Sequence, residues 1–148
     1  LVVLINDNIK LLSALDKSII IDFKKNTEKM IFNSDKEQLS RVFFNLIKNS
    51  IESIQQKSKK DVNFKRNIGI ELNDNNHHIS LIINDTGIGF KTLNTNIKDI
   101  LNPYFTTKTN GTGLGLSIVN KILNDHNGSI EFISKDDGAE IKIVFLKK

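Results

Sequence analysis

Two glycine-rich turns constrain this chain more than any other feature of its sequence. The first, Asp85-Thr-Gly-Ile-Gly-Phe90, follows an alternating apolar segment, and the second, Gly111-Thr-Gly-Leu-Gly-Leu116, precedes a segment with helical spacing. A carboxylate at a strand end followed by Gly-x-Gly lets the backbone approach a flat ligand. A glycine run that opens a helix offers free N–H groups and the positive end of the helix dipole to phosphate. A single run usually serves only a turn, but two in this order indicate a ligand site.

A helix with two asparagines on one line is predicted upstream of both turns. Ser34 and Glu37 form a Ser-x-x-Glu capping box, so we expect the helix to begin at Ser34. Its apolar or small stripe recurs at helical spacing and consists of Leu39, Val42, Phe43, Leu46, Ile47, Ser50 and Ile54. The opposite face carries Arg41, Asn45, Lys48, Asn49 and Glu52. Taken alone, Asn45 and Asn49 are most simply two exposed residues, although Asn is a poor helix former.

The remaining pattern predicts helices alternating with pairs of strands. We expect a helix over residues 2–15, strands at 19–23 and 30–32, a loop at 55–67, and a hairpin of strands 68–72 and 79–85. A last helix over 116–126 ends at Asn127-Gly128, and strands 130–132 and 141–145 form a closing hairpin. Residues 91–110 hold the only proline, Pro103, and are predicted to form a lid with a helical turn at 97–101. This order predicts an α+β fold: a two-layer sandwich whose mixed, mostly antiparallel sheet is covered on one face by about three helices.

Composition limits the classes of protein to consider. The 148 residues suggest one domain, 1–148, and the absence of cysteine excludes a disulfide framework or a thiolate metal site. The chain starts at Leu1 within an amphipathic pattern, so we expect it to be a piece of a longer protein. The net charge of +4 comes from scattered basic residues, which favours a solvated surface over nucleic-acid binding. We interpret His77 and His78 as surface residues, and His126 as a packed or dipole-complementing residue.

Four motifs together resemble the ATP-binding domain of sensor histidine kinases, in the superfamily that includes gyrase, Hsp90 and MutL. Asn45-Leu-Ile-Lys-Asn49 is similar to the N box, and Asp85-Thr-Gly-Ile-Gly89 to the first glycine box. Phe105-Thr-Thr-Lys108 is similar to the F box, and Gly111-Thr-Gly-Leu-Gly-Leu116 to the second glycine box. The resemblance runs over nearly the whole chain. The Pro-Tyr-Phe-Thr-Thr-Lys segment is similar to the nitrogen-regulation branch of these kinases.

The resemblance implies that Mg²⁺ and the phosphates of ATP lie between the asparagine helix and the second glycine run. Asn49 would coordinate Mg²⁺, Asn45 would lie beside the metal and phosphates, and Lys48 would come within reach of phosphate. The backbone N–H groups expected to face the phosphates are those of Gly111, Thr112, Gly113, Leu114 and Gly115.

The adenine and the lid are assigned in the same way. Asp85 would accept a hydrogen bond from the adenine amino group, which guanine lacks, while Gly87 and Gly89 let the backbone pass the base. Phe105 would anchor the lid, and Thr107 or Lys108 would touch the γ-phosphate. The residues expected to act in phosphoryl transfer are Asn45, Asn49 and Lys108.

Two departures from the family pattern matter. The phosphoaccepting histidine of these kinases lies in an upstream dimerisation helix, before an acidic residue, and none of the three histidines here has that setting. Glu52 stands where many members carry lysine, so we expect it to contact Lys48 or Arg41 on its own helix face. The resemblance therefore implies a monomeric, cytoplasmic catalytic domain that serves a histidine-bearing dimerisation domain of the same protein, with a response regulator downstream. Whether the parent protein is anchored in a membrane is left open.

Other functions remain as alternatives. An ATPase of the gyrase or MutL type usually carries Glu at the first N-box position to activate water, and Asn45 cannot deprotonate water. A non-enzymatic regulatory module would bind nucleotide or a partner without transfer. A serine kinase of the same superfamily would share all four boxes.

Overall fold

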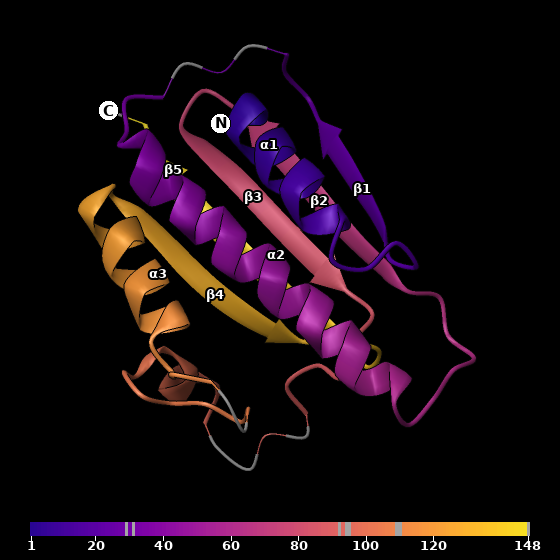
Figure 1. Ribbon diagram of the computed structural model, residues 1–148. Helices are drawn as coiled ribbons and strands as arrows, with labels where there is room; N and C mark the ends of the chain where they lie inside the picture. Colours follow the sequence, from indigo (N-terminus) through magenta and orange to yellow (C-terminus); the bar gives the residue numbers. More distant parts are fainter. Residues whose placement is uncertain (29, 31, 92, 94–95, 109–110, 148) are drawn as a thin grey trace.

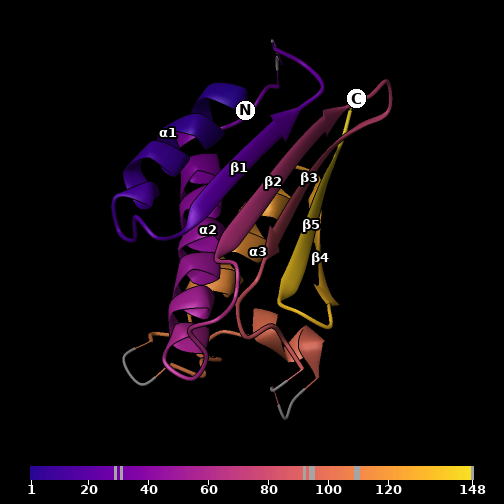
Figure 2. The same ribbon diagram turned by 90° about the vertical axis from the view of Figure 1, so that its right-hand side faces the viewer.

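Three α-helices lie across one face of a five-stranded sheet in the part of the chain that the structure describes (Figure 1). This structure is a computed structural model that describes residues 1–28, 30, 32–91, 93, 96–108 and 111–147. The helices are α1 (Val2–Ser13), α2 (Lys36–Ser58) and α3 (Gly115–Asp125), with a 3-10 helix η1 (Ile97–Leu101). The strands are β1 (Ile20–Lys25), β2 (Asn67–Asp74), β3 (His78–Asp85), β4 (Gly128–Ser134) and β5 (Ala139–Leu146). Figure 2 shows the two layers edge-on, which confirms the predicted α+β sandwich.

The sheet is mixed, as predicted, and its middle strand ends at Asp85. The strand order is β1-β2-β3-β5-β4, with β1 parallel to β2 and every other pair antiparallel. Ile79, Leu81 and Ile83 of β3 point inward and are buried. Period-two alternation places Asp85 on that same inner face, between Ile68 of β2 and Ala139 of β5.

Helix α2 lies between α1 and α3 and carries the largest share of the helical core. The whole predicted stripe of this helix is buried, and Ile51 joins it. Because that stripe faces the sheet, the polar residues of α2 are turned toward solvent and toward the segment before α3. Although α2 has 23 residues, no helix in the described residues is both long and apolar enough to cross a membrane.

The start of α2 differs from the prediction, since Asp35 caps it and Ser34 does not. The Asp35 carboxylate accepts hydrogen bonds from the backbone N–H groups of Glu37 and Gln38, both at 3.0 Å. The Ser34 hydroxyl instead donates to the Phe32 carbonyl at 3.4 Å. A carboxylate is the stronger cap because its charge also complements the helix dipole.

Helix α2 also continues through Ser58, so the loop predicted at 55–67 is wrong in its first four residues. Lys57 holds this extra turn, because its ammonium donates to the Thr86 carbonyl at 3.0 Å and pairs with Asp137. The predicted strand at 30–32 is also wrong where it can be described: Met30 and Phe32 belong to no strand, and Ile31 lies outside the described residues. The predicted lid at 91–110 is described at 91, 93 and 96–108, and η1 confirms its helical turn.

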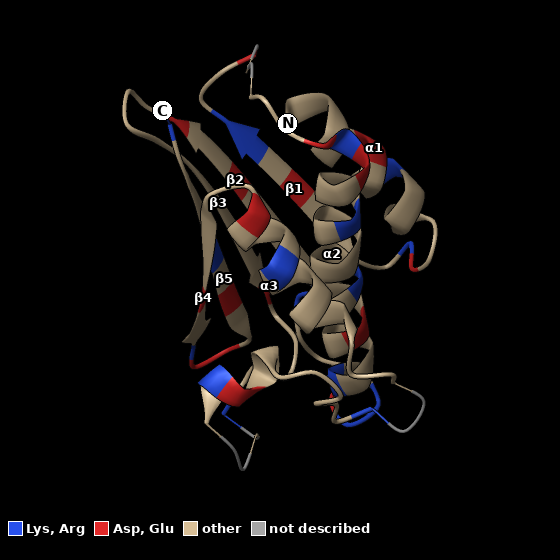
Figure 3. Ribbon diagram, turned by 90° about the vertical axis from the view of Figure 1, so that its left-hand side faces the viewer, with Lys and Arg blue, Asp and Glu red and all other residues tan. Residues whose placement is uncertain are grey.

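His126 packs between two helix ends, which confirms the structural interpretation of this residue. Its Nδ1 donates to the Ile122 carbonyl at 2.7 Å, and its Nε2 accepts from the Asp35 N–H at 3.0 Å. The ring therefore ties the end of α3 to the start of α2. Figure 3 shows Lys and Arg interspersed with Asp and Glu over the helices, as in a solvated surface.

Gly138 in the β4–β5 turn should be far less tolerant of substitution than Gly69 in β2. Gly138 has φ +94°, and a Cβ there would overlap the Asp85 carbonyl oxygen, whereas a Cβ at Gly69 would meet nothing within 4 Å. We expect Gly138→Ala to lower the free energy of unfolding by at least about 2 kcal/mol. Gly69→Ala should change it by no more than about 1 kcal/mol, in the stabilising direction. Urea unfolding of both variants checks this, and equal midpoints would contradict it.

Candidate functional site

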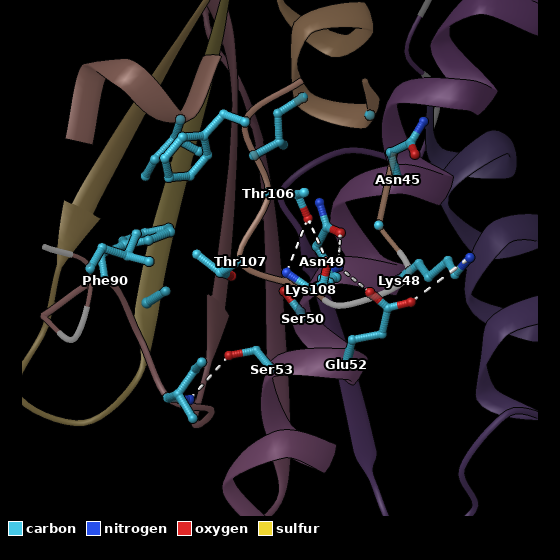
Figure 4. Close-up of a pocket in the computed structure, with 18 of the residues that line it drawn as sticks. Asn45, Lys48, Asn49, Ser50, Glu52, Ser53, Phe90, Thr106, Thr107 and Lys108 are labelled. Carbon is cyan, nitrogen blue, oxygen red and sulfur yellow. Dashed lines mark hydrogen bonds and ion pairs between the residues drawn. The ribbon is translucent and has the colours of Figure 1, made fainter. Parts of the chain in front are cut away.

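A pocket of about 470 Å³ opens between α2, the end of β3 and the segment that leads into α3 (Figure 4). Most of the residues predicted for the site line it. They are Asn45, Lys48, Asn49, Asp85, Gly89, Phe105, Thr107, Lys108, Gly111, Thr112, Gly113 and Gly115. The four motifs, which extend from Asn45 to Leu116 in the sequence, therefore meet in one cavity.

Gly87 and Leu114 were predicted for the site but do not line the pocket. Gly87 lies against α2, where an added Cβ would overlap the Ser53 side chain. This contact brings the turn onto the helix, and the Ile88 N–H donates to Ser53 Oγ at 3.1 Å. Leu114 is the residue before α3, and its backbone N–H, which was predicted to face the phosphates, donates to Thr112 Oγ1 at 3.4 Å.

One end of the pocket combines a buried carboxylate with apolar walls. Asp85 is only 6% exposed, and its Oδ1 accepts from the Gly87 N–H at 2.9 Å. Burial raises the pKa of this carboxyl, and the Gly87 N–H, the nearby Ser50 and Ser53 hydroxyls and Lys57 offset part of that rise. The apolar lining includes Ile88, Phe90, Leu116, Phe132 and Ile141. Such an end suits a flat ring with a polar edge.

Ser50 beside Asp85 was predicted only as part of the apolar stripe, yet it lines the pocket. The residue is 2% exposed, and its hydroxyl lies beside the Asp85 carboxylate, whose pKa it helps to lower. Because it can donate or accept, this hydroxyl offers a second polar group to the edge of a ligand. Sequence periodicity could not separate Ser50 from its stripe, because Ser50 recurs at the same helical spacing as the apolar residues.

The other end of the pocket is polar and carries both signs of charge. Asn49 Oδ1 accepts from the Lys108 ammonium at 2.9 Å, and the same ammonium pairs with the Glu52 carboxylate (Figure 4). Lys48 lies 3.8 Å from Glu52, which confirms one of the two contacts expected for that carboxylate. The contact with Lys108 links residues 56 apart in sequence, and no local pattern predicts it.

Asn45 faces the start of α3. Its Nδ2 donates to the Arg41 carbonyl at 2.8 Å, and a Cβ added at Gly115 would lie 3.2 Å from its Oδ1. Gly113 has φ +68° and lies against the backbone of Tyr104. Because no side chain caps α3 in the described residues, the first N–H groups of this helix remain available to a ligand.

Comparison with known proteins agrees with this geometry. Residues 34–148 match the family described as histidine kinase-, DNA gyrase B- and HSP90-like ATPases. The chain belongs to this family. It is 32% identical over 146 residues to a Rickettsia conorii protein named as an NtrY-like sensor histidine kinase, covering 98% of this chain and 23% of that protein. The chain thus spans about a quarter of the length of this relative.

Solved structures of the family share the whole fold. The nucleotide-free catalytic domain of the histidine kinase ThkA is 27% identical and superposes with a TM-score of 0.80, covering 99% of this chain and 92% of that domain. ThkA in complex with the response regulator protein TrrA superposes with a TM-score of 0.74 at 23% identity, covering 100% of this chain and 40% of that one. Both structures confirm the predicted fold class, and the nucleotide-free domain, at 27% identity, also agrees with the family resemblance.

We expect Asp85 to titrate above the ordinary aspartate pKa of about 3.9, because burial dominates its shift. A folded-state pKa above the unfolded value means that folding disfavours the ionised form. The contribution of Asp85 to stability therefore falls as pH rises through its folded pKa. An NMR titration of side-chain carboxyl carbons checks this, with Asp136, whose pKa is lowered by Lys91, as the internal control. Coinciding titration midpoints for the two residues would refute the raised pKa of Asp85.

Proposed function

We propose that this domain binds Mg-ATP in the pocket and donates the γ-phosphate to a histidine on a separate dimerisation domain of the same protein. The proposal rests on one observation: a buried acceptor, Asp85, and the start of α3, whose N-cap residue makes no side-chain capping bond, line a single pocket. A nucleotide has the matching polarity, with a flat base at one end and anionic phosphates at the other.

The Asp85 end supports selectivity for adenine. The exocyclic amino group of adenine donates a hydrogen bond, whereas guanine presents a carbonyl oxygen at that position. Two acceptors would then face each other in a buried site, which is costly. The Ser50 hydroxyl can either donate or accept, so it complements the same edge of the base.

The opposite end supports the phosphates and the metal. Backbone N–H groups at the start of α3, Lys48 and Lys108 supply positive potential for the phosphates. Asn49 fits a metal, because its amide oxygen already holds a cation, the Lys108 ammonium, at 2.9 Å. When bound, Mg²⁺ supplies charge neutralisation to the phosphates. The residues of the chain orient the nucleotide and place its terminal phosphate near the open side of the pocket.

Among the described residues, the polar end of the pocket has no free base, which favours transfer over hydrolysis. Asn45 is an amide, and the Glu52 carboxylate is engaged by Lys108 and Lys48 in the described structure. The three histidines do not line the pocket, and His126 is held by its packing contacts. The nucleophile therefore comes from outside this chain, and ThkA with TrrA offers the precedent of a response regulator as downstream partner.

Calorimetric titration with a non-hydrolysable ATP analogue, with and without Mg²⁺, tests the proposal directly. We expect binding that Mg²⁺ strengthens and that the corresponding GTP analogue does not reproduce. If a sample shown to be folded by circular dichroism binds neither nucleotide, the regulatory module without transfer becomes the better account.

Asp85→Asn should reduce the preference for the ATP analogue over the GTP analogue by about tenfold, which is about 1.4 kcal/mol, because an amide can present either a donor or an acceptor. Asp136→Asn is the matched control, since it removes the same charge from an exposed turn. Calorimetry on both variants gives the two ratios. An unchanged preference in Asp85→Asn would remove Asp85 from the adenine site.

A further inference from the structure

Lys108 lies in a small cation site built by two residues of α2. Asn49 and Glu52 are three positions apart, so their side chains project from one helix face. Asn49 Oδ1 accepts from the Lys108 ammonium at 2.9 Å, and the Glu52 carboxylate pairs with that same ammonium. Figure 4 shows the three side chains converging at the polar end of the pocket.

The oxygens around this ammonium are those that a hard divalent cation selects. Mg²⁺ takes oxygen ligands, commonly one or two from protein and the rest from phosphate and water. An amide oxygen and a carboxylate oxygen directed at one point meet that requirement. The ammonium and Mg²⁺ cannot share the point, because two cations in contact with the same oxygens repel each other strongly.

We propose that Asn49 and Glu52 form one cation site whose occupant is exchanged. The Lys108 ammonium fills it without nucleotide, and Mg²⁺ that enters with nucleotide displaces Lys108 toward the terminal phosphate. This inference rests on the proposed binding of Mg-ATP. It assigns to Glu52, the departure from the lysine of many relatives, a part in holding the metal.

The charges around Glu52 determine how nucleotide binding differs with and without Mg²⁺. A nucleotide without metal would draw Lys108 away and leave the Glu52 carboxylate facing the phosphates. Among the described ion pairs of Glu52, the one with Lys48, whose Nζ lies 3.8 Å away, would then remain to offset its charge. Mg²⁺ removes that repulsion by replacing the ammonium. Glu52 therefore makes nucleotide binding depend on the metal.

Titration with Mg²⁺ alone, at constant ionic strength, tests the exchange. The readout is the side-chain amide signals of Asn49 in NMR spectra of nucleotide-free protein. Lys108→Met should tighten Mg²⁺ binding about fivefold, since it removes the competing ammonium, and Glu52→Gln should weaken it by a similar factor. Glu37→Gln is the control: it removes an exposed carboxylate from the first turn of the same helix and should leave the midpoint unchanged.

The exchange requires the two substitutions to change the Mg²⁺ affinity in opposite directions. Equal midpoints in Lys108→Met and Glu52→Gln, or no response to Mg²⁺ in Lys108→Met, where no ammonium competes for the oxygens, would overturn the exchange. Circular dichroism of each variant establishes that it is folded, and Lys108→Gln repeats the test if Lys108→Met is not.

A second measurement separates this inference from the proposed function. The ratio of nucleotide-analogue affinities with and without Mg²⁺ should shrink about fivefold in Glu52→Gln and stay constant in Glu37→Gln. If the wild type binds Mg-nucleotide while Glu52→Gln keeps the full ratio, the cation exchange is wrong and the proposed function stands. If the wild type binds no nucleotide, the proposed function itself fails.

Discussion

The packing of α2 on the sheet is the constraint on which the site depends. Leu39, Val42, Leu46 and Ile54 are completely buried, so the rotation of this helix about its axis is fixed by the core. With 3.6 residues per turn, that rotation also fixes where Asn45, Asn49 and Glu52 point. The polar end of the pocket is thus a by-product of how the apolar stripe is buried.

The end of the pocket that holds Asp85 is positioned by a different set of contacts, which join the turn after β3 to the same helix. Gly87 approaches Ser53 too closely to admit a Cβ, the Ile88 N–H donates to Ser53, and Lys57 holds the Thr86 carbonyl. These contacts hold the turn that follows Asp85 against α2, the helix that carries Asn49.

The sequence was sufficient to predict most of the helices and strands and most of the residues of the candidate site, since both depend on local patterns. Alternation predicted the two hairpins, and the four motifs identified twelve of the residues that line the pocket. The failures have physical causes beyond the local pattern. Asp35 and Ser34 are adjacent residues able to cap, and the carboxylate is the stronger. The last turn of α2 depends on Lys57 contacts 29 and 80 residues away. The hydrogen bond from Lys108 to Asn49 joins residues 59 apart in sequence, so the fold brings them together and no local pattern predicts the contact.

A crystal structure of this domain with Mg²⁺ and a non-hydrolysable ATP analogue would test the central claim most directly. We expect the adenine amino group to lie on Asp85, the phosphates at the start of α3, and Mg²⁺ on Asn49. A nucleotide bound outside the pocket, or with its base away from Asp85, would contradict it.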